Sequence, residues 1–153
     1  MTSISNDSEF RQALEALDNT RQRVVAARFV EHVLDLTSDE RLALVTKTAA
    51  KSAASDAELA AALGSARAAT FDSHTRCGSE GDWSAQAGYF VARAAAAAVT
   101  PPGQLPGGGA WQAAVSSRMA RTCETIARDA TAGTPGGGES AAQYRILSEF
   151  LDS

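Results

Sequence analysis

The chain has 153 residues, a length that suits one domain, and its 14 Lys and Arg stand against 18 Asp and Glu, a net charge of −4. That acidic balance argues against a nucleic-acid-binding surface, which needs a basic excess. Alanine supplies 33 residues, whereas Leu, Ile, Val and Phe together supply 27, and because alanine favours helix and loses little side-chain entropy, we predict closely packed helices rather than a disordered chain.

The first half of the chain shows helical spacing of apolar residues, interrupted by polar capping signals. Capping boxes are expected where Ser, Thr or Asn precedes Glu by three residues. The sequence offers these pairs as Asn6 with Glu9, Thr37 with Glu40 and Ser55 with Glu58. The predicted helices run from about 6 to 17, from 20 to 36, after 40, and from 55 towards 71. The second has a wide apolar stripe, which predicts a central position.

The second half is divided by glycine and proline. The stretch 74–82 reads as a loop, with Asp82 or Ser79 capping a helix over 83–99. Further helices are expected over about 110–130 and 139–151, separated by flexible Gly/Pro-rich loops at about 100–109 and 132–138. No run of residues alternates between apolar and polar with the two-residue period of a strand. We therefore predict a single all-α domain, residues 1–153, built as a bundle of six to seven helices.

Several features favour a cytoplasmic protein. The first residues lack the basic and apolar regions of a signal peptide. The most apolar run, 89–99, is too short to span a bilayer, which takes about 20 residues. The two cysteines, Cys77 and Cys123, are too few for a disulfide framework, and we expect both to be reduced thiols.

Three small groups of residues could carry chemistry. His74 and Cys77 could form an activated nucleophile or, with Asp72, a partial zinc site, but a helix end followed by a structural cysteine explains them as well. His32 could be a general base oriented by Asp35, or one member of an exposed polar pair. Glycines 107–109 before a helix could bind phosphate, although the lysine of a phosphate loop is missing. We therefore expect no catalytic residue, metal or cofactor.

Two sets of side chains are candidates for contact with a partner. Arg118, Arg121 and Arg128 fall near one helix face and could meet an acidic protein, although Glu124 can pair with Arg128. Trp83 and Trp111 open two consecutive predicted helices and could be binding hot spots or core-packing residues.

Three segments together resemble a known kind of protein. They are the residues from Ala26 to Leu34, Thr37-Ser-Asp-Glu-Arg41 and Ser55-Asp-Ala-Glu-Leu-Ala-Ala-Ala62, followed by Trp- and Ala-rich helices. These segments resemble Ala-rich helical proteins of planctomycetes and related bacteria, and are similar to helical domains assigned as immunity proteins. The resemblance implies a helical protein-binding domain and no particular site residue.

Taken together, the sequence predicts a non-enzymatic protein-interaction module of a bacterial cytosol. Its partner is expected to be another protein, either a toxin that it neutralises or a second copy of itself, with no nucleic acid and no membrane. Two alternatives remain open at this stage. One is a small-molecule site between alanine-lined helices, and the other is an enzyme that uses His74, Cys77 or His32.

Overall fold

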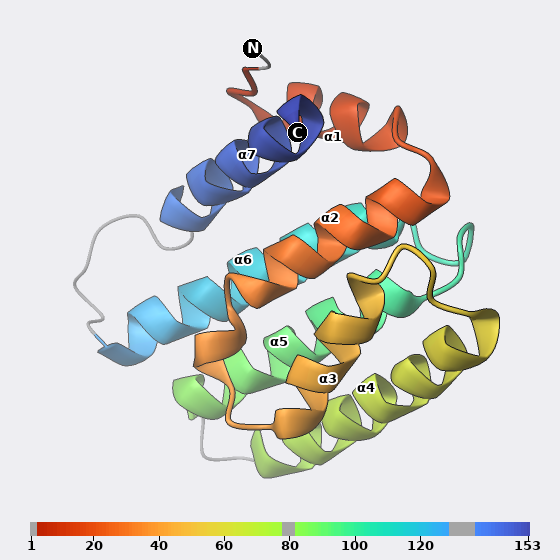
Figure 1. Cartoon of the computed structure of the whole chain (residues 1–153). Coiled ribbons are helices and arrows are strands. Elements are labelled where there is room, and N and C mark those ends of the chain that lie inside the picture. The colour runs from red at the N-terminus through yellow and green to blue at the C-terminus, as the bar shows by residue number, and fades with distance from the viewer. Residues whose placement is uncertain (1–2, 78–81, 129–136) are drawn as a thin grey trace.

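The computed structural model of the chain describes residues 3–77, 82–128 and 137–153, and in these ranges it contains helices and no strand. Figure 1 shows the helices stacked as a bundle, which confirms the predicted all-α architecture. The elements in chain order are α1 (Asp7–Glu15), α2 (Asn19–Glu31), the 3-10 helix η1 (Leu34–Leu36), α3 (Glu40–Ala49), α4 (Asp56–Cys77), α5 (Trp83–Val99), α6 (Gly109–Arg128) and α7 (Gly137–Asp152).

Local capping signals define several helix starts as predicted. The Asn6 side chain accepts a hydrogen bond from the Glu9 amide at 2.9 Å. Ser55 and Glu58 form the expected reciprocal box, in which each backbone amide donates to the other's side chain at 3.0 Å. Asp82 accepts from two amides at the start of α5. These carboxylates, amides and hydroxyls satisfy donors that a helix leaves unpaired at its first turn.

The capping box predicted at Thr37 and Glu40 is wrong. Asp39 is the residue that caps α3, because its carboxylate accepts from the Arg41 amide at 3.0 Å and is also held by the Arg41 guanidinium. Thr37 instead accepts from the Asp39 amide at 3.1 Å. The preceding helix also ends earlier than predicted, at Glu31, and the chain reaches Thr37 through η1.

The loop predicted from residue 74 begins later in the structure. Helix α4 continues through His74 to Cys77, so that His74 is a helical residue. No glycine or proline interrupts the sequence between Gly64 and Gly78, and therefore nothing local stops the helix before that point. The predicted loop around 132–138 lies mostly outside the described residues, whereas α7 begins at Gly137.

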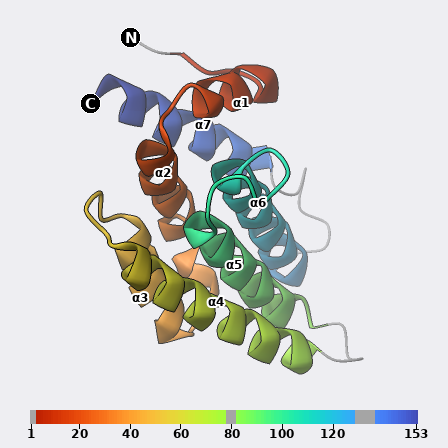
Figure 2. The same cartoon turned by 90° about the vertical axis from the view of Figure 1, so that its right-hand side faces the viewer.

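Helix α5 occupies the middle of the bundle because its side chains are small. It packs against α2, α3, α4 and α6, and its residues Ala92, Ala94 and Ala95 are completely buried. The predicted central helix, α2, also contacts several neighbours but shares that position with α5. Figures 1 and 2 show α4 at one edge of the bundle, with α1 and α7 on the opposite side.

The contact between α5 and α6 is too close for a side chain at one position. A Cβ atom built on Gly109, the first residue of α6, would lie 2.6 Å from the backbone oxygen of Ala97. That oxygen belongs to a helix backbone and cannot move aside easily. Gly64 offers a contrast within α4, since a Cβ atom there would meet nothing within 4 Å.

These two glycines give a matched test of the packing. We expect Gly109→Ala to lower the free energy of unfolding by about 1–3 kcal/mol, because the new methyl group overpacks the α5–α6 contact. Gly64→Ala should raise it by about 0.5–1 kcal/mol, because alanine is the better helix former and no neighbour is in the way. Urea denaturation of both variants measures the difference, and equal effects would contradict the close contact.

Candidate functional site

Arg118, predicted as a contact for an acidic partner, is engaged within the molecule. Its guanidinium donates to both carboxylate oxygens of Asp7, at 2.9 and 3.0 Å, and to the Gln143 side-chain oxygen at 2.8 Å. The Tyr144 hydroxyl donates to the same Asp7 carboxylate at 2.8 Å. The network joins α6 to α1 and α7, so a partner carboxylate would have to displace Asp7.

Arg121 lies in a second network, between α6, α7 and the end of α2. It donates to Glu139 at 3.2 Å and to the backbone oxygen of His32 at 3.0 Å, and Asp35 lies 3.4 Å away. Burial alone would lower the pKa of Arg121, but Glu139 and Asp35 together raise it. His32 Nδ1 lies 2.7 Å from Glu139, so Glu139, and not the predicted Asp35, is the carboxylate next to this imidazole.

Sequence reasoning missed two buried polar residues of α7. The Glu139 side chain is only 1% exposed, and Gln143 is completely buried and donates to the Ala114 backbone oxygen at 2.9 Å. A signal for them exists in the sequence, because both share a helical face with the buried Leu147 at spacings of four residues. A polar side chain on the buried face of a helix indicates that a hydrogen-bonding partner is buried beside it.

The remaining predicted contact residues have different surroundings. Arg128 is exposed and pairs with Glu124 at 3.4 Å, the spacing expected along one helix. Trp111 packs beside Phe10, with ring centroids 6.2 Å apart, and the Arg11 guanidinium lies 4.6 Å above its ring. Trp83, at the start of α5, is 42% exposed. Of the two tryptophans, only Trp83 leaves much of its ring in solvent.

The candidate His74–Cys77 chemistry is only partly covered by the structure, because the Cys77 side chain lies outside the described residues. The two other members of the group face different neighbours. The His74 ring lies 5.6 Å from the ring of Tyr89 in α5, whereas Asp72 pairs with Arg41 at 3.0 Å near the start of α3. Within the described ranges, no three His, Cys, Asp or Glu side chains are grouped as a metal site would require.

Packing accounts for part of the glycine run at 107–109. Gly107 and Gly108 have φ angles of 74° and 92°, a left-handed conformation that favours glycine. A Cβ atom on Gly107 would also lie 2.7 Å from the Trp111 indole. Glycine therefore allows the loop to lie directly against this ring.

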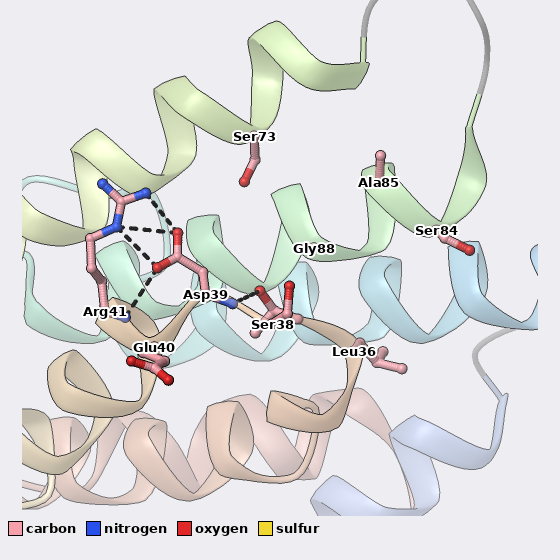
Figure 3. A pocket seen from close by; sticks show the side chains of 10 residues that line it. Leu36, Ser38, Asp39, Glu40, Arg41, Ser73, Ser84, Ala85 and Gly88 are labelled. Atoms are coloured by element: carbon pink, nitrogen blue, oxygen red, sulfur yellow. Dashed lines mark hydrogen bonds and ion pairs between the residues drawn. The ribbon is translucent and has the colours of Figure 1, made fainter.

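A polar hollow lies where the η1–α3 connection meets α4 and the start of α5. Its volume is about 490 Å³, and it is lined by residues 36–41, Ser73, Ser84, Ala85 and Gly88 (Figure 3). Arg41 bridges Asp39 and Asp72 at 2.7 and 3.0 Å, and these carboxylates raise its pKa above the usual value. Arg41 and Asp39 at this hollow are thus already paired with each other, which leaves Glu40 and several hydroxyl groups to meet a ligand.

A larger hollow, which we call the α4–α5 groove, has a volume of about 560 Å³ and a more apolar lining. The α4 wall and the α5 wall each present side chains at helical spacing, and the loop before α6 closes the groove with Leu105. Figure 2 shows the two wall helices side by side. The lining consists of Leu63, Arg67, Thr70, Phe71, His74, Tyr89, Arg93, Ala96, Ala97, Thr100, Gln104, Leu105, Gln112 and Ser116.

The charge of the α4–α5 groove is opposite in sign to that of the whole chain. Arg67 and Arg93 line it, and no Asp or Glu is among the described residues of its lining. Neither guanidinium has a carboxylate within 4.0 Å in the part of the chain that the structure describes. Arg93 lies 5.8 Å from the ring centre of Tyr89, a cation–π distance that restrains it at the groove.

Comparisons of the chain with protein-family models, with curated proteins and with solved structures found no match. The resemblance to bacterial helical proteins and immunity proteins therefore stays a prediction. In the described ranges, every helix is too short or too polar to cross a membrane.

The Asp7–Arg118 contact predicts a pH-dependent contribution to stability. The Arg118 guanidinium lowers the pKa of Asp7; burial opposes this shift and the Tyr144 hydroxyl adds to it. Because the pKa of Asp7 is lower in the folded than in the unfolded chain, its charge contributes to the free energy of unfolding. This contribution is fully present above the unfolded-state pKa, about 3.9, and is lost as the pH falls through the folded-state pKa. Because Asp7 is half exposed, we expect Asp7→Asn to cost about 1 kcal/mol at pH 7.

Urea denaturation of the wild-type chain and Asp7→Asn, at pH 7 and at pH 3, measures this contribution. The difference between the two proteins should shrink at the lower pH. Glu15→Gln is the matched control, since Glu15 is an exposed residue of the same helix with no ion pair among the described residues. A difference that stays constant with pH would contradict the proposed role of the Asp7 charge.

Proposed function

We propose that the chain is a non-enzymatic protein-interaction module of a bacterial cytoplasm, and that its α4–α5 groove binds a segment of a partner protein. The observation that carries the proposal is Phe71, which is 68% exposed and lines the groove together with Tyr89 and Leu105. Aromatic side chains at an apolar hollow are enriched at binding sites, where they supply a large area for burial.

The two threonine hydroxyls in the α4–α5 groove favour binding over catalysis. Thr70 and Thr100 donate to backbone oxygens one turn earlier in their own helices, at 2.8 and 2.7 Å. The imidazole of His74 lies against the Tyr89 ring. A hydroxyl nucleophile would need a base within hydrogen-bonding distance, and these contacts orient each threonine towards backbone instead.

A small-molecule ligand is the second candidate, favoured by the volume of the same groove. About 560 Å³ falls within the range of ligand pockets. Native mass spectrometry of the purified protein tests it directly, because a retained ligand would add a discrete mass that Phe71→Ser should lose.

The interaction proposal is tested by capture of partners from the source organism with the wild-type chain and with Phe71→Ser. We expect a specific partner to be retained by the wild-type chain and reduced at least tenfold by the substitution, since the apolar contact is lost. A partner that proves to be a toxin, with cells rescued from it by the chain, would establish the immunity function.

Leu44→Ser is the matched control for this capture. Leu44 is 66% exposed on α3, nearly as much as Phe71, but it does not line the α4–α5 groove. Both variants should unfold at the same urea concentration as the wild-type chain, because both positions are exposed. Equal retention of the partner by Phe71→Ser and Leu44→Ser would contradict binding through the groove.

A further inference from the structure

We infer that the segment bound in the α4–α5 groove is an acidic amphipathic α-helix. Its apolar side chains would cover Phe71 and Leu105, and its carboxylates would face Arg67 and Arg93. The inference rests on the proposed function and adds to it the shape and the charge of the partner.

The shape of the groove matches a helix of about three turns. Along α4 its lining runs from Leu63 to His74, and along α5 and its C-cap from Tyr89 to Thr100, twelve residues or eleven helical steps in each case. At about 1.5 Å per residue each wall is about 16 Å long. Helices are recognised in apolar grooves through side chains spaced three or four residues apart, a pattern that a wall of this length can accommodate.

The two arginines of the groove are staggered along it. The chain reverses between α4 and α5, and the His74–Tyr89 ring contact fixes which residues of the two helices are level with each other. In that register Arg93 is level with Thr70, about one helical turn from Arg67. Carboxylates one turn apart on a bound helix, at i and i+3 or i+4, could therefore each meet a guanidinium.

The charge of the groove favours an acidic occupant over the other candidates. A second copy of the chain related by two-fold symmetry would bring the same patch against itself, so that Arg67 and Arg93 would meet like charges. A nucleic acid would be repelled by the net charge of −4. An acidic helix gains from both arginines, and its remaining charge stays in solvent.

The test uses the full chain and a labelled synthetic peptide as the probe. The peptide is a helix of about four turns, with Leu at i, i+3, i+7 and i+10 and Glu on both flanks of that stripe. A second peptide has Lys in place of every Glu. Fluorescence anisotropy at low salt should show that the Glu peptide binds at least tenfold more tightly than the Lys peptide, and that added salt weakens its binding.

Charge reversal of the groove provides the decisive comparison. Arg67→Glu with Arg93→Glu should weaken binding of the Glu peptide at least tenfold and strengthen binding of the Lys peptide. The control is Lys47→Glu with Arg145→Glu, which changes the net charge equally at exposed positions of α3 and α7 that do not line the groove. This control should bind the Glu peptide within about twofold of the wild-type chain.

The possible failures separate the inference from the proposed function. Absence of binding by the Glu peptide, or equal binding by both double variants, would overturn the inference about the acidic helix. The groove would still be the binding site if Phe71→Ser lost the natural partner while Leu44→Ser kept it. The proposed function itself would fail if the natural partner were retained equally by those two single variants.

Discussion

Close approach of helix backbones, permitted by alanine, is the constraint on which the rest of the structure depends. Helix α5 is buried on most of its surface, and it contacts four other helices through side chains no larger than Val over much of its length. At the α5–α6 contact, even the methyl group of an alanine at Gly109 would collide with the Ala97 backbone. Such a core buries little apolar area per residue, but it gains from dense contact between the helices. The central position of α5 is therefore decided by the small size of its side chains rather than by a few large ones.

On α4, this arrangement leaves one large side chain at the periphery, where it can serve binding. Phe71 stands in solvent on α4, at the edge of the bundle, while the smaller Ala66 and Ala69 of the same helix are buried. Polar networks strengthen the opposite side: Arg118 with Asp7 ties α1 to α6, and Glu139 ties α7 to both α2 and α6. Arg118 and Arg121 on that side are paired with carboxylates, whereas Arg67 and Arg93 at the α4–α5 groove have no carboxylate partner within 4.0 Å in the described ranges. The two pairs of arginines thus differ in whether a carboxylate of the same chain neutralises them.

Sequence reasoning succeeded where the determining contacts are local. The Ser55–Glu58 box acts within one turn and forms in full, and Asn6 caps α1 as predicted, although the Glu9 carboxylate accepts from Ser5 rather than from Asn6. Sequence reasoning failed at Thr37 because Asp39, held by Arg41, provides a competing cap. Contacts such as His32 with Glu139 join residues 107 positions apart, and no local pattern indicates them. The α4–α5 groove was equally hidden, because alanine lies on both the buried and the exposed face of α4, so that composition does not show which face is turned outward.

The most direct measurement of the alanine constraint is the stability of Ala94→Leu relative to Ala68→Leu. Ala94 is completely buried in α5, whereas Ala68 is exposed on α4, and both substitutions add the same atoms to a helix. If close approach of the backbones holds the bundle together, Ala94→Leu should lower the free energy of unfolding by about 1–3 kcal/mol or more. Ala68→Leu should change it by less than about 0.5 kcal/mol. A bundle that tolerated leucine equally well at both positions would contradict the claim that small side chains determine its packing.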